Sequence, residues 1–483
     1  MACNVQVLPH KVNLRVLKGT NLLEALRGAG LFIDAPCGGR GTCGKCTVII
    51  REQQRLACDY FVEDDIAVTL PHDHEARILT TGWMPERAAD PLRNGYLVAV
   101  DIGTTTVVCV LMDCAGQELA VRSMTNPQVP WGADVISRIQ AAQRGQREAL
   151  TEAVCHGIQR LIRECCAAAG ITMDAVGVIS IVGNSCMQQL FLGMDVNNLA
   201  GAPFDPAITR TEIAAARDYL PDCANAKLLI LPDIAGFVGA DTLGCILAAE
   251  LHEAADTVLM VDIGTNGELV LAHNGTLTAC STAAGPALEG GNISCGMRAA
   301  SGAVDRVWSG GCRVIEGGEA RGVCGSGLID TAAVMLNEGI MNFRGRILTP
   351  DHTYQITEGV ILTQDDIRQL QMAKGAIAAG IQLLAEQRGL SLGQIDRVIL
   401  AGAFGSFLDA SNACRIGLLP QELENKITAA GNLALGGAKA LAMDKKLLPL
   451  AQEILEKTVA VELSKLPEFS MAFAENMLFP NDK

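Results

Sequence analysis

The stretch Leu259-Met-Val-Asp-Ile-Gly-Thr-Asn-Gly-Glu268 decides the fold, because a near copy, Leu97-Val-Ala-Val-Asp-Ile-Gly-Thr-Thr-Thr106, occurs earlier in the same chain. Each copy predicts an apolar strand, a tight turn and a return strand. The glycine lets the backbone approach a phosphate, and the hydroxyl residues after it add hydrogen-bond donors. One such turn is weak evidence, since Asp-Gly pairs are common in hairpins. Two copies in the same context predict two related lobes that clasp one nucleotide.

The two turns supply the candidate nucleotide-binding residues. Asp101 and Asp262 end the first strand of each copy and are the candidate catalytic residues, because a carboxylate there can hold hydrated magnesium or orient water. The alternative for either aspartate is that it only caps its turn. The residues expected to hold the phosphates are Gly103, Thr104, Thr105, Thr106, Gly264, Thr265, Asn266 and Gly267.

Four cysteines in and after a glycine-rich stretch predict an iron–sulfur cluster. Cys37, Cys43, Cys46 and Cys58 have the spacing C-x5-C-x2-C-x11-C, which differs by one residue from the plant-type ferredoxin spacing. Glycines leave backbone amides free to point at the sulfurs of a 2Fe-2S cluster. Structural zinc and reduced structural thiols are the alternatives. Zinc sites more often pair two C-x2-C knuckles, and only Cys43 and Cys46 form one here.

The residues around these cysteines predict a small α+β domain. Residues 5–17 alternate between apolar and polar side chains like two short strands, Asn21 can cap a helix over 22–28, and residues 47–50 resume as a strand. A small sheet with one helix and a cluster loop is the ferredoxin-like β-grasp arrangement.

Composition restricts the class of protein. At 483 residues, with 49% hydrophobic and 19% charged residues, the chain fits two or three well-buried domains. A net charge of -15 argues against general nucleic-acid binding. The amino terminus lacks a secretory pattern, and the apolar stretch 97–112 is interrupted by Asp101 and Gly103, so we expect no membrane span. The 18 cysteines then fit a reducing cytoplasm.

The chain divides into three parts. We expect a 2Fe-2S ferredoxin-like domain over 1–70, a linker over 71–95 that is rich in proline and turn residues, and an ATPase domain over 96–483. Strands alternate with helical stretches in the last part, including a helix over 371–388, which predicts a multi-domain α/β architecture with lobes near 96–257 and 258–483.

Five segments of the third part resemble a known superfamily. The segments 97–113, 182–184, 259–275, 401–405 and the helix opening at Gly431 follow the order of the first phosphate, first connecting, second phosphate, adenosine and second connecting motifs. They resemble the actin-like fold of acetate and sugar kinases, heat-shock chaperones and actin. With the iron–sulfur domain in front, nearly the whole chain resembles the reductive activators of corrinoid-dependent enzymes. The span between Cys46 and Cys58 and the linker are compact for that family.

The resemblance implies a function. Such activators hydrolyse ATP with Mg²⁺ and transfer one electron from a 2Fe-2S cluster to cob(II), regenerating cob(I) for methyl transfer. It implies a corrinoid protein of a methyltransferase system as partner, and a low-potential donor such as ferredoxin or flavodoxin. Gly402 and Gly405 would let adenosine lie against the backbone. The sequence leaves open the oligomeric state, a homodimer included, and the roles of Asp233, Asp241, Glu289 and Arg298.

Three other functions compete with this one. A small-molecule kinase with a regulatory iron–sulfur domain would use the same nucleotide pocket, but it needs a phosphoryl acceptor. A nucleotide-gated redox sensor would hydrolyse ATP without responding to a corrinoid. Activators of radical dehydratases resemble the ATPase part, but they are short chains with a differently placed cluster, so the amino-terminal cysteine domain counts against them.

Overall fold

The computed structural model describes residues 2–8, 12–29, 31, 33, 39, 41, 46–51, 53–70 and 82–481. Two of the predicted cluster ligands, Cys37 and Cys43, lie outside these residues. No helix of the described part is long and apolar enough to cross a membrane.

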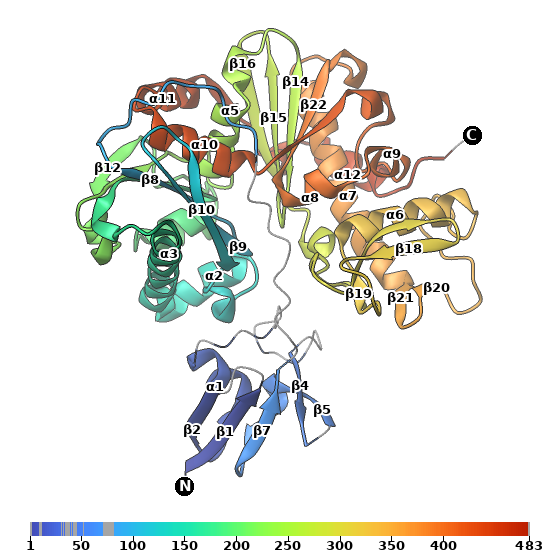
Figure 1. Cartoon of the computed structure of the whole chain (residues 1–483). Helices are drawn as coiled ribbons and strands as arrows, with labels where there is room; N and C mark the ends of the chain where they lie inside the picture. The colour runs from blue at the N-terminus through green and yellow to red at the C-terminus, as the bar shows by residue number, and fades with distance from the viewer. Residues whose placement is uncertain are drawn as a thin grey trace.

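The amino-terminal domain is a small sheet with one helix, as the alternating pattern predicts (Figure 1). Its sheet has the order β2-β1-β7-β4-β5, with β1 and β7 parallel, and alternate residues of β1 such as Val5 and Val7 form its core. The elements are β1 (Ala2–Leu8), β2 (Val12–Leu17), β3 (Thr20–Asn21), α1 (Leu22–Gly28), β4 (Thr47–Ile50), β5 (Gln53–Leu56), β6 (Phe61–Val62) and β7 (Ile66–Thr69).

The first lobe of the body is built on a six-stranded sheet of order β10-β9-β8-β11-β13-β12. The first phosphate turn joins β8 to its antiparallel partner β9, and β11 runs parallel to β8 on the other side. The elements are β8 (Tyr96–Ile102), β9 (Thr106–Met112), β10 (Glu118–Thr125), α2 (Val135–Ala141), α3 (Arg147–Ala169), β11 (Val176–Gly183), α4 (Ser185–Phe191), β12 (Glu212–Ala215), β13 (Lys227–Ile230) and α5 (Ala240–Ala248).

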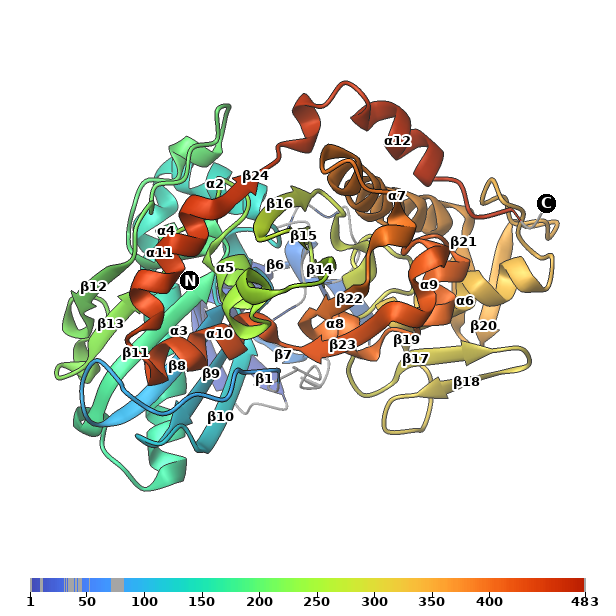
Figure 2. The same cartoon turned by 90° about the horizontal axis from the view of Figure 1, so that it is seen from above.

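The second lobe repeats this plan with the order β23-β22-β14-β15-β16-β24, in which β14 and β15 flank the second phosphate turn. A smaller sheet and a hairpin extend the lobe (Figure 2). The elements are β14 (Val258–Ile263), β15 (Gly267–His273), β16 (Thr276–Thr282), β17 (Ala303–Trp308), β18 (Gly311–Val314), β19 (Gly322–Val323), α6 (Gly325–Asn337), β20 (Thr353–Thr357), β21 (Val360–Thr363), α7 (Gln364–Gln387), β22 (Arg397–Ala401), α8 (Gly402–Phe407), α9 (Ala410–Arg415), β23 (Ile427–Gly431), β24 (Thr458–Ala460) and α12 (Phe469–Asn476).

Helix α7 begins earlier than the predicted 371. It starts at Gln364, where the Thr363 side chain accepts from the Asp366 N–H and the Asp366 carboxylate accepts from the Thr363 N–H. This reciprocal cap satisfies two backbone donors, so the polar residues before 371 join the helix although they add little to its apolar stripe.

Helices α5 and α10 (Leu433–Met443) pack against each other between the two large sheets. Their core also contains buried residues of β8 and β14, and α10 is followed by α11 (Leu447–Lys457). The approach is close, since a Cβ on Gly437 would lie 2.1 Å from the Gly244 carbonyl oxygen. At α10 the chain therefore returns to the first lobe and joins it to the second.

Residues 82–94, which we call the strap, bind along α10 just before the first lobe begins. The Trp83 N–H donates to the Ala430 carbonyl at 3.0 Å, and the Asp90 N–H donates to the Met443 carbonyl at 2.8 Å. A Cβ on Gly82 would lie 2.2 Å from the Asn432 carbonyl oxygen. The carboxyl-terminal half of the expected linker is therefore part of the body.

Candidate functional site

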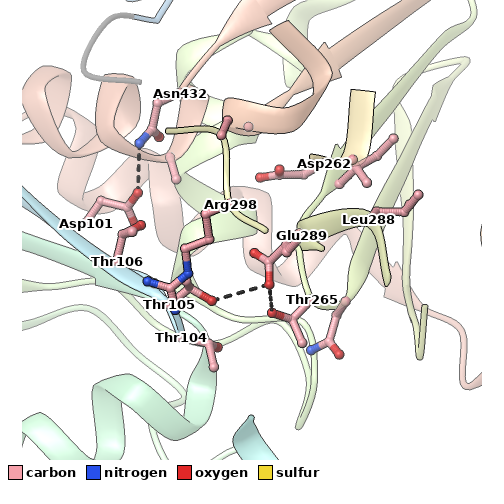
Figure 3. A pocket seen from close by; sticks show the side chains of 18 of the residues that line it. Asp101, Thr104, Thr105, Thr106, Asp262, Thr265, Leu288, Glu289, Arg298 and Asn432 are labelled. Atoms are coloured by element: carbon pink, nitrogen blue, oxygen red, sulfur yellow. Dashed lines mark hydrogen bonds between the residues drawn. The ribbon is translucent and has the colours of Figure 1, made fainter. Parts of the chain in front are cut away.

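A pocket of about 260 Å³ lies between the lobes where the two phosphate turns face each other (Figure 3). Asp101 lies at the end of β8 in the sheet of the first lobe, and Asp262 lies at the end of β14 in the sheet of the second lobe. Both residues line the pocket. The predicted residues that line the pocket are Asp101, Gly103, Thr104, Thr105, Thr106, Asp262, Gly264, Thr265, Asn266 and Gly402.

Two of the predicted binding glycines, Gly267 and Gly405, are not among the residues that line this pocket. Gly267 lies at the start of β15, where a Cβ would meet Thr282 Oγ1 at 2.6 Å. Gly405 lies within α8, where a Cβ would lie 3.1 Å from the Leu400 Cβ. Both glycines allow close packing behind the turns, and sequence alone does not distinguish that role from contact with a ligand.

The first phosphate turn is fixed from behind by buried side chains. Arg138, which is fully buried, donates to the Thr104 carbonyl oxygen at 2.5 Å and to the Gly132 carbonyl oxygen at 3.0 Å. Asn126 Nδ2 donates to the Gly103 carbonyl oxygen at 2.8 Å. A Cβ on Gly103 would lie 2.8 Å from the Thr106 carbonyl oxygen, so the turn needs glycine there. These contacts fix the turn before any ligand arrives.

A pair of asparagines connects the turns to two helix starts. Asn184 accepts from the Met187 N–H at the start of α4, and its Nδ2 donates to Thr104 Oγ1 at 2.9 Å. Asn432 accepts from the Leu435 N–H at the start of α10, and its Nδ2 donates to Asp101 Oδ2 at 2.9 Å. Each asparagine therefore caps a helix and orients a pocket residue at the same time.

Four carboxylates line the pocket, and burial is the largest cause that raises the pKa of each. Burial raises the pKa of Asp101 to about 6, and burial with the nearby Asp101 charge raises the pKa of Asp262 to about 6. Burial raises the pKa of Asp241 to about 7, with the charges of Asp101 and Asp262 adding to it. Burial and the Asp241 charge raise the pKa of Glu268 well above its usual value. A cation in the pocket would relieve this repulsion.

Within the described ranges, no group of three or more histidine, cysteine, aspartate or glutamate side chains is arranged to hold a metal ion.

Side chains from the second lobe also reach the first. Glu289 Oε2 accepts from Thr265 Oγ1 at 2.6 Å and from Thr105 Oγ1 at 3.3 Å (Figure 3). Arg298 Nη1 donates to Thr125 Oγ1 of β10 at 3.5 Å. Both side chains line the pocket, so their roles belong to this site.

In the amino-terminal domain, two of the predicted cluster ligands lie together. Cys46 is 1% exposed and Cys58 is 8% exposed, and burial together with a hydrogen bond between the two thiols raises the pKa of Cys58 to about 11. The Gly41 backbone N–H also hydrogen-bonds the Cys58 sulfur. Adjacent buried thiols with an amide directed at sulfur fit an iron–sulfur cluster.

Several residues of the pocket were not predicted as site residues. Asn184 and Asn432 could have been found, because the pair Gly-Asn precedes a helix in both connecting segments. Glu268 follows the second turn, yet nothing in the sequence shows that its side chain turns toward the pocket. Phe407 reaches the pocket from α8 by tertiary packing, which sequence spacing does not reveal.

Comparisons with known proteins agree with this structure along the whole chain. The 2Fe-2S iron–sulfur cluster binding domain matches residues 5–68, the RACo middle region matches 96–254, and the C-terminal ASKHA domain of RACo matches 256–483. These matches confirm the predicted fold class, a ferredoxin-like domain followed by an actin-like ATPase body, with its cluster and ATP sites.

Individual relatives cover most of the chain. The corrinoid activation enzyme RamQ of Eubacterium limosum is 29% identical, over 93% of this chain and 94% of that protein. A reductase of the Co(II) methylated amine-specific corrinoid protein of Methanosarcina barkeri is 26% identical, over 76% and 74%. The solved structure of a reductive activator for a corrinoid, iron–sulfur protein superposes with a TM-score of 0.75 at 27% identity, covering 100% of this chain and 99% of that one. The chain therefore belongs to the family of reductive activators of corrinoid-dependent enzymes.

Proposed function

We propose that this protein hydrolyses ATP to drive the transfer of one electron to a corrinoid protein, reducing cob(II) to cob(I) for methyl transfer. The observation that carries the proposal is the presence, in one chain, of a cysteine pair suited to a cluster and a pocket lined by two phosphate turns from opposite lobes. The reaction needs both a one-electron donor and a site at which ATP is bound and hydrolysed.

We assign Cys37, Cys43, Cys46 and Cys58 as the cluster ligands. When bound, the 2Fe-2S cluster supplies the single electron that cobalt accepts. Burial of Cys46 and Cys58 excludes water from that side of the cluster, and the Gly41 N–H donates to sulfur. A low-potential donor such as ferredoxin or flavodoxin would restore the electron.

ATP is required because the transfer is uphill. The reduction potential of a plant-type cluster is about -400 mV, and cob(II) is reduced at a still lower potential. Each additional ~59 mV of a one-electron step costs about a factor of ten in the equilibrium constant. A ligand can shift this equilibrium only by binding two states differently. ATP binding would close the two lobes, and the closed form would bind the corrinoid protein in a state in which cobalt is easier to reduce. The difference in affinity between the open and closed forms would then drive the electron transfer.

Different residues of the pocket are assigned to the phosphates, the cation and adenosine. The residues of the first turn and Gly264, Thr265 and Asn266 of the second would hold the phosphates, and Asp101 and Asp262 would hold hydrated Mg²⁺ or orient water. Gly402 and Gly405 would let adenosine lie against the backbone. Gly402 has a φ of 79°, and a Cβ there would lie 2.4 Å from Asp262 Oδ1, so any other residue would disturb that carboxylate.

The domain limits and setting are part of the proposal. We place the cluster domain at 1–70, the linker at 71–95 and the ATPase body at 96–483, with lobes near 96–257 and 258–483. Every cysteine that the structure describes is a free thiol, which supports a reducing cytoplasm. The partner is a corrinoid protein of a methyltransferase system.

The test is anaerobic and uses visible spectroscopy. The reduced protein is mixed with a cob(II) corrinoid protein, with and without Mg²⁺ and ATP, and the cob(I) band is expected only with ATP. Cys43→Ser should abolish it, whereas Cys114→Ser, which changes an exposed cysteine in the turn after β9, should not. Turnover of ATP without any change in cobalt, across several corrinoid partners, would favour the kinase or sensor instead.

A further inference from the structure

Glu289 holds the two phosphate turns together across the cleft. Its Oε2 accepts from Thr265 Oγ1 in the second turn and from Thr105 Oγ1 in the first, at 2.6 and 3.3 Å. The two hydroxyls come from different lobes, and a single carboxylate oxygen joins them (Figure 3). The connection lies inside the pocket that the nucleotide must enter.

The carboxylate is fixed to the second lobe. Glu289 ends a short 3₁₀ turn, Pro286–Glu289, in which Ala287 and Leu288 are buried in the core of that lobe. The next residue, Gly290, has a φ of 77°, and a Cβ there would lie 2.4 Å from the Met297 carbonyl oxygen. The backbone at Glu289 cannot easily shift, so release of the hydroxyls requires its side chain to turn away.

A phosphate and this carboxylate cannot share the same donors. A threonine hydroxyl has one proton to donate, so Thr105 and Thr265 can each donate either to Glu289 or to a phosphate oxygen. Two anions that approach one another in a partly enclosed site also repel. A phosphate that enters between the turns must therefore displace the carboxylate.

We propose that Glu289 is a latch that closes the nucleotide-free pocket and that the terminal phosphate of ATP opens it. This inference rests on the proposed function, because it assumes that the pocket binds ATP. ADP lacks the phosphate that would reach between the turns, so it leaves the latch in place. Glu289 is a positioning residue whose carboxylate, by bridging the two hydroxyls, sets the difference between ATP and ADP binding.

The test compares nucleotide affinities in Glu289→Gln. The amide is nearly isosteric but uncharged, so it releases the hydroxyls more easily and no longer repels phosphate. We expect about tenfold tighter binding of a non-hydrolysable ATP analogue, with ADP affinity changed by less than about twofold. Calorimetry on the anaerobic, cluster-containing protein measures both. The KM for ATP should fall with the affinity, while a change confined to kcat would contradict the latch.

The control is Glu319→Gln, which removes the same charge from an exposed position of the same lobe and should change neither affinity. Equal changes for both nucleotides, or weaker binding of the ATP analogue, would overturn the latch and indicate a purely structural role. If Glu289→Gln does not fold, Glu289→Asp serves instead, since a shorter carboxylate cannot span both hydroxyls and should shift the same ratio in the same direction. Failure of the wild-type protein to bind ATP would refute the proposed function itself.

Discussion

Arg138 determines how firmly the first phosphate turn is held. Burial lowers its pKa to about 10, so it stays charged at neutral pH, and its guanidinium donates to Thr104, Gly132 and Gln128 together. Lysine carries charge but cannot reproduce this planar fork. We expect Arg138→Lys to raise the KM for ATP about tenfold or more and to destabilise the fold by about 1–3 kcal/mol, with the cluster spectrum unchanged.

Steady-state ATP hydrolysis and urea unfolding measure these effects. Arg144→Lys is the matched control, because Arg144 is exposed on the neighbouring π-helical turn and should tolerate the change. An unchanged KM in Arg138→Lys would show that the turn keeps its shape without the fork.

Lys374 should make stability depend on pH. Burial lowers its pKa to about 7, and its ammonium lies 5.1 Å from the centre of the Phe479 ring and donates to the Leu478 carbonyl. The unfolded chain keeps an ordinary lysine pKa near about 10.4, so it binds more protons than the folded chain between these values. The cost of burying the ammonium is complete below pH 7 and is relieved as pH rises toward about 10.

The corresponding measurement is urea unfolding of wild type and Lys374→Met at about pH 7 and pH 9.5. Wild type should gain about 1–3 kcal/mol relative to the variant over this range. Lys457→Met, at an exposed lysine, should show no such change. A pH-independent difference between wild type and Lys374→Met would mean that the lysine stays charged or stays neutral throughout.

At the scale of elements, the strap connects the cluster domain to the nucleotide site. Gly82 lies against the backbone of Asn432, whose side chain donates to Asp101 in the pocket. Gly82→Ala would force a Cβ to within 2.2 Å of a carbonyl oxygen, so the start of the strap should detach. We expect ATP hydrolysis to persist while ATP-dependent cobalt reduction falls about tenfold.

Parallel assays of phosphate release and cob(I) formation would test this. Gly393→Ala, at a glycine with open space around it, is the matched control. If both activities fall together in Gly82→Ala, the strap supports the pocket and does not transmit its state.

The strands that flank the two phosphate turns could be predicted from the sequence. Strands β8, β9, β14 and β15 form where the repeated pattern predicts them, because an apolar strand before Asp-Ile-Gly-Thr is a local signal. The start of α7 depends on a side-chain cap, and the strap depends on contacts with α10, far along the chain. Such features arise from particular hydrogen bonds or from tertiary packing and are not local in sequence.

At the scale of the whole molecule, the site is assembled from distant segments. The sequence predicts both phosphate turns, but the arrangement of Glu289, Arg298 and Phe407 in the pocket follows only from how the lobes pack. The same packing places Gly267 and Gly405 behind the turns. The order of the motifs in the sequence indicates the family, whereas the contact of Glu289 with both turns depends on the tertiary packing of the lobes.

Covalent linkage of the two functions gives a further prediction. A specific protease site introduced between Leu70 and Gly82 would let the linker be cut after assembly. Before cleavage the cluster domain is held near the body at a high effective concentration, so the rate of cobalt reduction per molecule should not change on dilution. After cleavage, we expect this rate to fall on dilution, as stopped-flow spectroscopy at several protein concentrations would show. An unchanged rate would mean that the domains bind each other tightly without the linker.

The anchoring of Gly82 at the rim of the nucleotide site also sets a geometric limit. Leu70 ends the described part of the cluster domain and stands twelve residues before Gly82. A chain of that length spans at most about 40 Å. The covalent connection therefore keeps Leu70 of the cluster domain within that distance of Gly82 on the ATPase body, so a corrinoid partner must receive its electron near the ATPase. The length of the connection between Leu70 and Gly82, as well as the shape of the protein surface, therefore limits which corrinoid proteins can be reduced.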